Sequence, residues 1–254
     1  MAKRLAETLG YSLVSREDVV QAATAYRVPG DKLREALVAA PGFWDRFSHD
    51  RRRYLALVQA GLCERVQGDR VVYHGNAGHL LMHGVSHVLC IRLIAPMETR
   101  VKLVMEREGV SSSEAVRIIE EVDDERKNWT SFLYGVDWLD PNLYDVTINL
   151  RTLDLDSAVR IASEAVRRPE FEPTEASRRA LANLTLASSV QAALATHEDT
   201  ASADVEVRAD DGVVFLKGTL RETNLTDAVI RVARQVDGVT DVNRDQLGAP
   251  DLLV

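Results

Sequence analysis

The sequence has little cysteine, few aromatic residues and no long apolar run. Two cysteines among 254 residues are too few for a disulfide framework, and Cys90 lies within the apolar run 88–94, which predicts a core thiol. No run of about 18 apolar residues occurs, so no membrane-spanning helix is expected. The first residues do not form an apolar signal segment, and we therefore expect a cytoplasmic protein.

A glycine-rich phosphate-binding loop is also absent. Neither the Gly-x-x-x-x-Gly-Lys-Ser/Thr spacing nor a Gly-Ser-Gly-Gly variant occurs in the chain. Residues 2–9 nevertheless have the apolar spacing of a helix, ended by Gly10 and followed by a short strand at 11–14, as expected for the helix after such a loop. His79 and His83 would share a helical face, but without a suitably spaced third ligand they predict no metal site.

Acidic residues outnumber basic ones, and the excess lies near the C-terminus. Residues 181–254 hold 6 basic and 12 acidic residues, whereas residues 1–180 hold 25 and 27. Phosphate backbones would be repelled by the C-terminal quarter, which argues against nucleic-acid binding there. Any anion site in the larger part must be built from locally placed arginines.

Alternating helices and strands predict an α/β protein with a parallel sheet and helices on both faces. The Ser111 to Glu114 spacing predicts a capping box. Helices are expected at 16–25, 31–40, 44–66, 96–108, 112–129 and 156–168, and strands at 71–73, 87–95 and 146–150.

The pattern changes after a proline- and charge-rich segment that begins near residue 168. We expect a domain at 1–168, a linker at 169–182 and a small α+β domain at 183–248. The sequence of the domain at 183–248 predicts a helix, a hairpin closed by the turn 210–212, a second helix near 224–235 and a strand at 242–247.

Five sequence blocks stand in order between residue 1 and about residue 167. They are Ala2 to Glu7 with Gly10; Val71 to Gly75; Ala95-Pro96 with Arg100 and Val104 to Gly109; Asp123 to Arg126; and Asp137-Trp138, Asp140-Pro141, Tyr144-Asp145 and Ile148-Asn149. In this order the chain resembles the cytidylate kinase-like family of nucleoside monophosphate kinases.

That resemblance implies phosphorylation of CMP, dCMP or a similar monophosphate by ATP with Mg²⁺, which needs placed positive charge more than covalent chemistry. The family's lid arginines correspond to Arg100, Arg107 and Arg126, and Asp123 or Asp124 would orient one of them or a metal-bound water. Alternatively, Arg100 and Arg107 form a solvated helix face paired with nearby glutamates.

The resemblance also implies an acceptor site and a donor site. The family carries Gly-Arg-Gly at the turn that binds the monophosphate, where this chain has Gly75-Asn76-Ala77 and therefore no charge; Arg53 is a candidate replacement. Lys3, Arg4 and Arg151 are the candidates for binding the nucleotide, and no metal-ligating residue is assigned.

In the family fold, the strand before the phosphate loop lies in the middle of the parallel sheet. Losing four or five buried strand side chains costs about 6–15 kcal/mol, comparable to the whole stability of a domain. Two explanations are open: the natural protein starts upstream of Met1, or it is a degenerate kinase whose remaining role is binding. In either case the 254 residues are expected to be catalytically inactive.

The C-terminal region carries a second resemblance. Asp211 to Gly218 (Asp-Gly-Val-Val-Phe-Leu-Lys-Gly) and Val236-Asp237-Gly238-Val239 resemble a BON domain, a small module associated with binding proteins or membranes. The alternative function is therefore a kinase-like scaffold whose BON domain binds a protein partner or membrane lipid. Its acidic charge favours a protein over anionic lipid.

Overall fold

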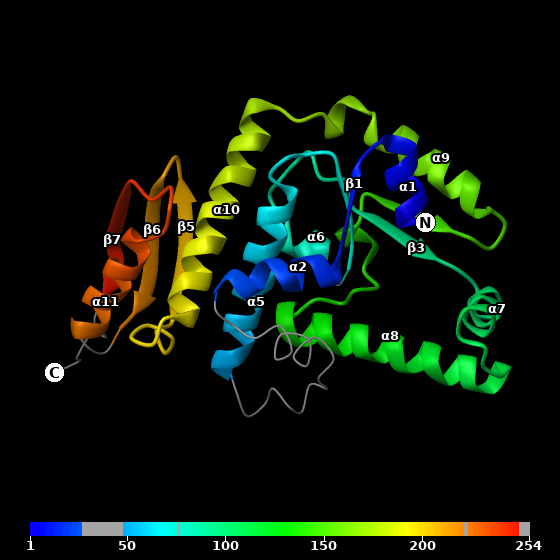
Figure 1. Ribbon diagram of the computed structural model, residues 1–254, viewed down its shortest axis with the longest axis horizontal. Helices are drawn as coiled ribbons and strands as arrows, with labels where there is room; N and C mark the ends of the chain where they lie inside the picture. The colour runs from blue at the N-terminus through cyan, green and yellow to red at the C-terminus, as the bar shows by residue number, and fades with distance from the viewer. Residues whose placement is uncertain (27–47, 76, 221–222, 249–254) are drawn as a thin grey trace. The chain divides into compact units, whose positions relative to one another are not determined.

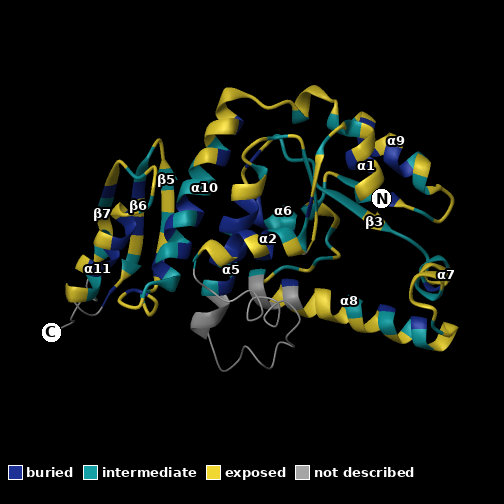
Figure 2. Cartoon of the chain, viewed as in Figure 1, coloured by how far each residue is buried: buried dark blue, intermediate teal, exposed yellow. Residues whose placement is uncertain are grey.

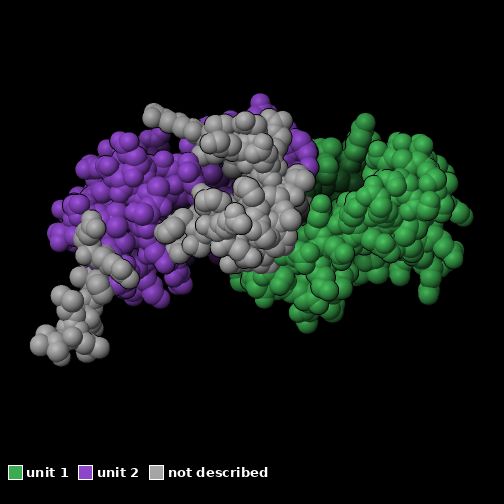
Figure 3. Space-filling view, turned by 90° about the horizontal axis from the view of Figure 1, so that it is seen from below, with its two compact units in different colours: residues 1–13, 70–173 green, residues 14–69, 174–254 purple. Residues whose placement is uncertain are grey.

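The computed structural model describes residues 1–26, 48–75, 77–220 and 223–248. They divide into two compact units: unit 1 comprises residues 1–13 and 70–173, and unit 2 comprises residues 14–69 and 174–254 (Figure 3). The predicted helix 31–40 and Asn76 lie outside the described residues.

Unit 1 is a mixed α/β layer (Figure 1). β3 (Ile91–Ile94) and β4 (Val146–Asn149) pair in parallel with Ile91 opposite Val146, as predicted. β2 (Val71–His74) pairs with β1 (Ser12–Ser15), so these four strands form two separate two-stranded sheets within the described residues, and the single continuous sheet expected is not found there. The predicted strand 87–95 is wrong in extent, because its first four residues lie outside β3. The helices are α1 (Ala2–Leu9), α6 (Gly78–Leu81), α7 (Met97–Glu108), α8 (Ser112–Tyr134) and α9 (Leu155–Val166), with 3-10 turns at Pro141–Leu143 and Pro169–Phe171.

The core of unit 1 lies where α1 and α9 cover the strands. Leu5 of α1, Ile148 of β4 and Ala162 of α9 are buried together, and Val72 and Ile91 from the two sheets pack against the same cluster. α1 ends at Gly10, whose φ of 66° is the left-handed conformation that glycine adopts without strain. The predicted helix at the start of the chain is therefore confirmed.

α7 and α8 form a helical hairpin with a small core of its own. Val101, Ala115 and Ile119 are buried between the two helices. Gly109 ends α7, and the Ser111 hydroxyl accepts a hydrogen bond from the Glu114 N–H at 3.3 Å, as the capping prediction requires. The reciprocal half of the capping box is wrong, because the Glu114 carboxylate accepts hydrogen bonds from Arg117 instead.

Unit 2 combines helices from the first third of the chain with its C-terminal region. α2 (Arg16–Ala23) packs on α5 (Ser48–Val66), and α10 (Glu175–Thr196) contacts both α5 and β5 (Val205–Asp210). A Cβ at Gly61 would lie 2.6 Å from the Val19 carbonyl oxygen, so only glycine permits this approach of α5 to α2. α10 begins eight residues earlier than predicted, because Thr174 and Ser177 cap it reciprocally.

The C-terminal part of unit 2 is a three-stranded sheet covered by helices. β6 (Val213–Thr219) lies between antiparallel β5 and parallel β7 (Asp241–Gly248), and α11 (Thr223–Arg234) precedes β7. Val214, Leu216 and Val229 are almost completely buried. Figure 2 shows buried residues within this part of the chain. Two N–H groups of the edge strand β7, those of Val242 and Asp245, bond to the side chains of Asp241 and Asn243.

The α5–α10 contact buries Cys63, whose sulfur lies 3.8 Å from the Ser188 hydroxyl oxygen. Burial raises the pKa of the Cys63 thiol to about 11, well above its usual value of 9.0. The half-buried Cys90 is not the closed core thiol predicted from its apolar run, although burial raises its pKa as well.

The Cys63 thiol is expected to make stability fall at alkaline pH. Between about pH 9 and 11 the unfolded thiol ionises and the folded one does not, so stability present below pH 9 is lost as the pH rises, by up to about 2–3 kcal/mol. Urea unfolding at pH 8, 9.5 and 11 measures this slope, and Cys63→Ala should reduce it, leaving the part that the raised pKa of Cys90 contributes. Equal slopes for the two proteins would contradict the prediction.

Candidate functional site

An arginine–aspartate pair joins the two helices of the hairpin. Arg100 of α7 donates from both terminal guanidinium nitrogens to the two carboxylate oxygens of Asp123 of α8, at 2.6 and 2.7 Å. The two side chains are 30% and 29% exposed, so the pair is partly shielded from water. Bidentate geometry fixes the plane of the guanidinium group. Two of the predicted catalytic residues, 23 positions apart in sequence, are thus brought into contact.

The other predicted hairpin residues are more exposed. The Arg107 side chain is 70% exposed and bonds to its neighbour Glu108 at 2.7 Å, which matches the solvated-face alternative. Asp124 and Arg126 are exposed on α8, and neither side chain has an ion-pair partner among the described residues. These three residues retain freedom to reorient, whereas Arg100 is held.

The turn after β2 is closed by an aromatic ring. A Cβ at Gly75 would overlap the hydroxyl of Tyr73, and one at Gly78 would lie 2.6 Å from its ring carbons, so a larger residue at either position would require the Tyr73 ring to move. Burial lowers the pKa of His79, whose ring lies 4.8 Å from that of Tyr144, so this imidazole is neutral at pH 7. Arg53 belongs to unit 2, and its buried Nε has no hydrogen-bond partner within the described ranges.

The predicted nucleotide-binding residues lie on α1 and after β4. Arg4 forms an ion pair with Asp156 of α9 at 2.7 Å, and Lys3 is exposed beside it. α9 begins one residue before the start expected at residue 156, because Asp154 accepts from the Ser157 N–H and caps the helix. Arg151 is exposed, and its backbone N–H donates to the Asn149 side chain at 2.9 Å.

Sequence reasoning missed a cation held by aromatic rings. Arg92 of β3 donates to the Leu139 carbonyl oxygen at 2.9 Å, with its guanidinium carbon 5.4 Å from the Trp138 ring centre and 5.6 Å from that of Tyr144. The Tyr144 hydroxyl donates to the Trp138 carbonyl oxygen at 2.9 Å. Arg92 thereby fastens the segment before β4 to β3. The signal was an arginine within an apolar strand, which needs a partner when partly buried.

The described residues offer neither a metal-binding cluster nor a membrane-spanning helix. They contain no group of three or more His, Cys, Asp or Glu side chains placed to hold a metal ion. None of their helices combines the length and apolar character that crossing a bilayer requires.

Comparison with known proteins assigns both parts of the chain. Residues 1–152 match the cytidylate kinase-like family, and residues 183–248 match the BON domain. Among curated proteins, the cytidylate kinase of Methanosarcina acetivorans is 34% identical over 112 residues, covering 41% of this chain and 59% of that protein. The cytidylate kinase of Pyrobaculum neutrophilum is 27% identical over 167 residues, covering 65% and 84%.

The match is partial for several of these relatives. The cytidylate kinase of Sulfolobus acidocaldarius is 37% identical over 83 residues, covering 32% of this chain and 44% of that protein. The chain spans about half the length of most of the curated relatives that it matches. A solved structure of an uncharacterised protein from Eubacterium ventriosum shares the fold, with a TM-score of 0.51, 20% identity and coverage of 65% of this chain and 88% of that one. The chain belongs to the cytidylate kinase-like family and carries a BON domain.

Proposed function

We propose that this chain provides the acceptor and lid parts of a cytoplasmic nucleoside monophosphate kinase that acts on CMP, dCMP or a similar monophosphate. The observation that carries the proposal is the Arg100–Asp123 pair in the hairpin of a cytidylate kinase-like chain. The curated relatives named above are cytidylate kinases, which supports this substrate class.

Arg100 suits phosphoryl transfer because Asp123 orients its guanidinium group but leaves some of its N–H donors without a partner among the described residues. A guanidinium group has five N–H donors, and Asp123 accepts from two of its nitrogens, one N–H each. Three N–H groups are left for phosphate oxygens, while the carboxylate holds the plane. Fixed positive charge of this kind is what phosphoryl transfer mainly asks of a protein.

The remaining candidate residues differ in how freely their side chains can move. Arg107 and Arg126 are proposed to close on the phosphates, and Asp124 to orient a metal-bound water. Gly75, Asn76 and Arg53 are proposed for the monophosphate. On the nucleotide side, Lys3 and Arg151 are exposed, whereas Arg4 would have to exchange its ion pair with Asp156.

ATP and Mg²⁺ do not fit the residues present as a complete site. Backbone amides of a glycine-rich loop and its lysine normally hold the donor phosphates, and the sequence contains no such spacing. Mg²⁺ is usually held by one or two carboxylates together with those phosphates, so the described carboxylates alone do not define its position. We derive no step through either group.

The proposal is tested by separating acceptor binding from turnover. Calorimetric titration of the 254-residue protein with CMP should give a measurable heat that AMP or GMP does not match. A coupled assay for ADP should stay at background with ATP, Mg²⁺ and CMP, because the donor loop is absent. Absence of CMP binding would refute the proposal, and CMP-dependent ATP turnover would refute the expected inactivity.

A second candidate function rests on the intact BON domain. Its core is closed around Val214, Leu216 and Val229, so it is a folded module independent of any nucleotide. We propose binding of a protein partner in preference to anionic lipid, because residues 181–254 carry twice as many acidic as basic residues. Flotation with phosphatidylglycerol vesicles should leave the protein unbound, and co-flotation would contradict this preference.

A further inference from the structure

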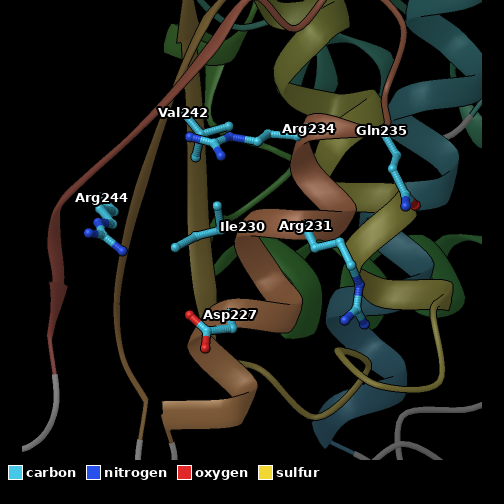
Figure 4. Close-up of a pocket in the computed structure, with 7 residues that line it drawn as sticks. All are labelled: Asp227, Ile230, Arg231, Arg234, Gln235, Val242 and Arg244. Carbon is cyan, nitrogen blue, oxygen red and sulfur yellow. The ribbon is translucent and has the colours of Figure 1, made fainter.

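A hollow lies between α11 and the edge strand β7 in the BON domain. Its volume is about 620 Å³, and three arginines line it together with one carboxylate and an apolar wall (Figure 4). In Figure 4 the side chains of Arg234 and Ile230 reach from α11 toward the β7 side, where Val242 and Arg244 lie, and Arg231 turns the other way. No described residue of the candidate kinase site lines this hollow.

The helical period of α11 determines which of its side chains are buried and which are exposed. Ala228, Val229, Val232 and Ala233 are buried against the sheet. Positions 227, 231 and 234, at helical spacing, are therefore left on the outer face, where they are exposed.

Arg244 lies at an irregularity in the pairing of β7 with β6. Val242 is buried opposite Val214, but the pairing shifts between Phe215 and Lys217, where β7 carries one extra residue. Arg244 lies in that bulge. A β-bulge redirects side chains and recurs next to functional sites.

Of the three arginines that line the hollow, one has an ion-pair partner among the described residues. Arg231 forms an ion pair with Asp199 at 2.6 Å. No described carboxylate pairs with Arg234 or Arg244, and Asp227 is the single acidic residue in the lining. Three of the six basic residues of the segment 181–254 are thus gathered in one place, within a region of twice as many acidic residues.

We propose that the hollow between α11 and β7 binds the phosphate group of a soluble small molecule. Arginine fits this chemistry because its planar fork donates bidentately to phosphate oxygens. Ile230 and Val242 offer an apolar wall beside the cations, which suits a ligand with a nonpolar or planar part next to its phosphate.

The acidic charge of the domain disfavours binding to an anionic membrane surface more than it disfavours binding of a small soluble anion. A membrane surface meets the whole acidic face of the domain, whereas a small anion within the hollow meets the arginines at a few ångströms. Screening over about 8 Å at physiological salt reduces the contribution of the more distant carboxylates. This inference stands independently of the kinase proposal.

The test uses ¹H–¹⁵N spectra of the full 254-residue protein titrated with pyrophosphate. Amide signals of residues 230–235 and 242–244, and the side-chain signals of Arg234 and Arg244, should shift together. Binding at those signals should weaken by about tenfold or more in Arg234→Gln/Arg244→Gln, since two charge-assisted contacts are lost. Both side chains are exposed, so the variant should fold, as unshifted core signals would show.

The matched control removes the same charge elsewhere in the domain. Arg208→Gln/Lys217→Gln replaces two exposed cations on β5 and β6 and should bind pyrophosphate within about twofold of the wild type. Unshifted signals at the hollow, or equal weakening in both double variants, would overturn the proposal. Shifts produced by phosphatidylglycerol vesicles but not by pyrophosphate would overturn the soluble source.

Discussion

Replacing Arg100 with alanine is expected to lower kcat/KM for CMP by about 10³-fold in a chimera that joins the strand and phosphate loop of a cytidylate kinase ahead of these 254 residues. A single transition-state arginine contributes about 10³–10⁵ in rate. The substitution also leaves Asp123 without its bidentate partner, at a place where new negative charge would repel the phosphates. Steady-state release of ADP at varied CMP measures the effect.

Arg117 supplies the control for this experiment. It lies on the same hairpin and pairs with Glu114 and Glu121, but its side chain is 57% exposed and no role in the site is assigned to it. Arg117→Ala should retain activity within about threefold, because exposed ion pairs contribute little to stability. Equal losses in the two variants would show that the hairpin needs its ion pairs only for folding, and would contradict a direct role for Arg100.

Replacing Leu216 with alanine is expected to destabilise unit 2 by about 2–5 kcal/mol, the usual range for a buried leucine. Leu216 is 1% exposed on the central strand β6. Because α10 packs on both β5 and α5, we expect the loss to reach α2 and α5, far earlier in the sequence. Hydrogen exchange should accelerate in residues 16–23 and 53–66 as well as in the BON domain.

The neighbouring Phe215 provides the comparison, since it lies on the same strand but is 41% exposed. Phe215→Ala should cost much less and leave exchange in α2 and α5 unchanged. The outcome also tests the predicted division into domains at 1–168 and 183–248. If Leu216→Ala accelerates exchange only within 183–248, the packing of α5 on α10 does not couple residues 14–69 to the BON domain, and unit 2 does not unfold cooperatively.

Local sequence signals predicted most helices and strands of the fold. Gly10, Gly109 and Ser111 mark helix ends by backbone conformation and capping, which are properties of a few neighbouring residues. The packing of α5 on α2 and on α10 could not be predicted in this way. The first contact depends on a close approach at Gly61, the second joins segments far apart in the sequence, and periodicity along the chain indicates neither.

The candidate site was predictable where a family pattern named the residue. Asp123 or Asp124 was expected to orient a lid arginine or a metal-bound water, and the structure shows the contact of Asp123 with Arg100, while the role itself stays a prediction. The pattern could not indicate that Arg4 is bound to Asp156, nor that Tyr73 fills the turn at Gly75. Both contacts depend on the three-dimensional positions of the side chains, which a sequence pattern does not give. The hollow between α11 and β7 was missed for the same reason, since its arginines come from a helix and a bulged strand.

The side-chain bonds along the edge of the BON sheet limit how another polypeptide can attach there. Asp241 and Asn243 already occupy the N–H groups of Val242 and Asp245. A partner that extends a sheet needs such donors to be available in a regular row. Two donors of β7 are therefore unavailable to an added strand, so a partner that meets this edge is expected to recognise side chains rather than to extend the sheet there.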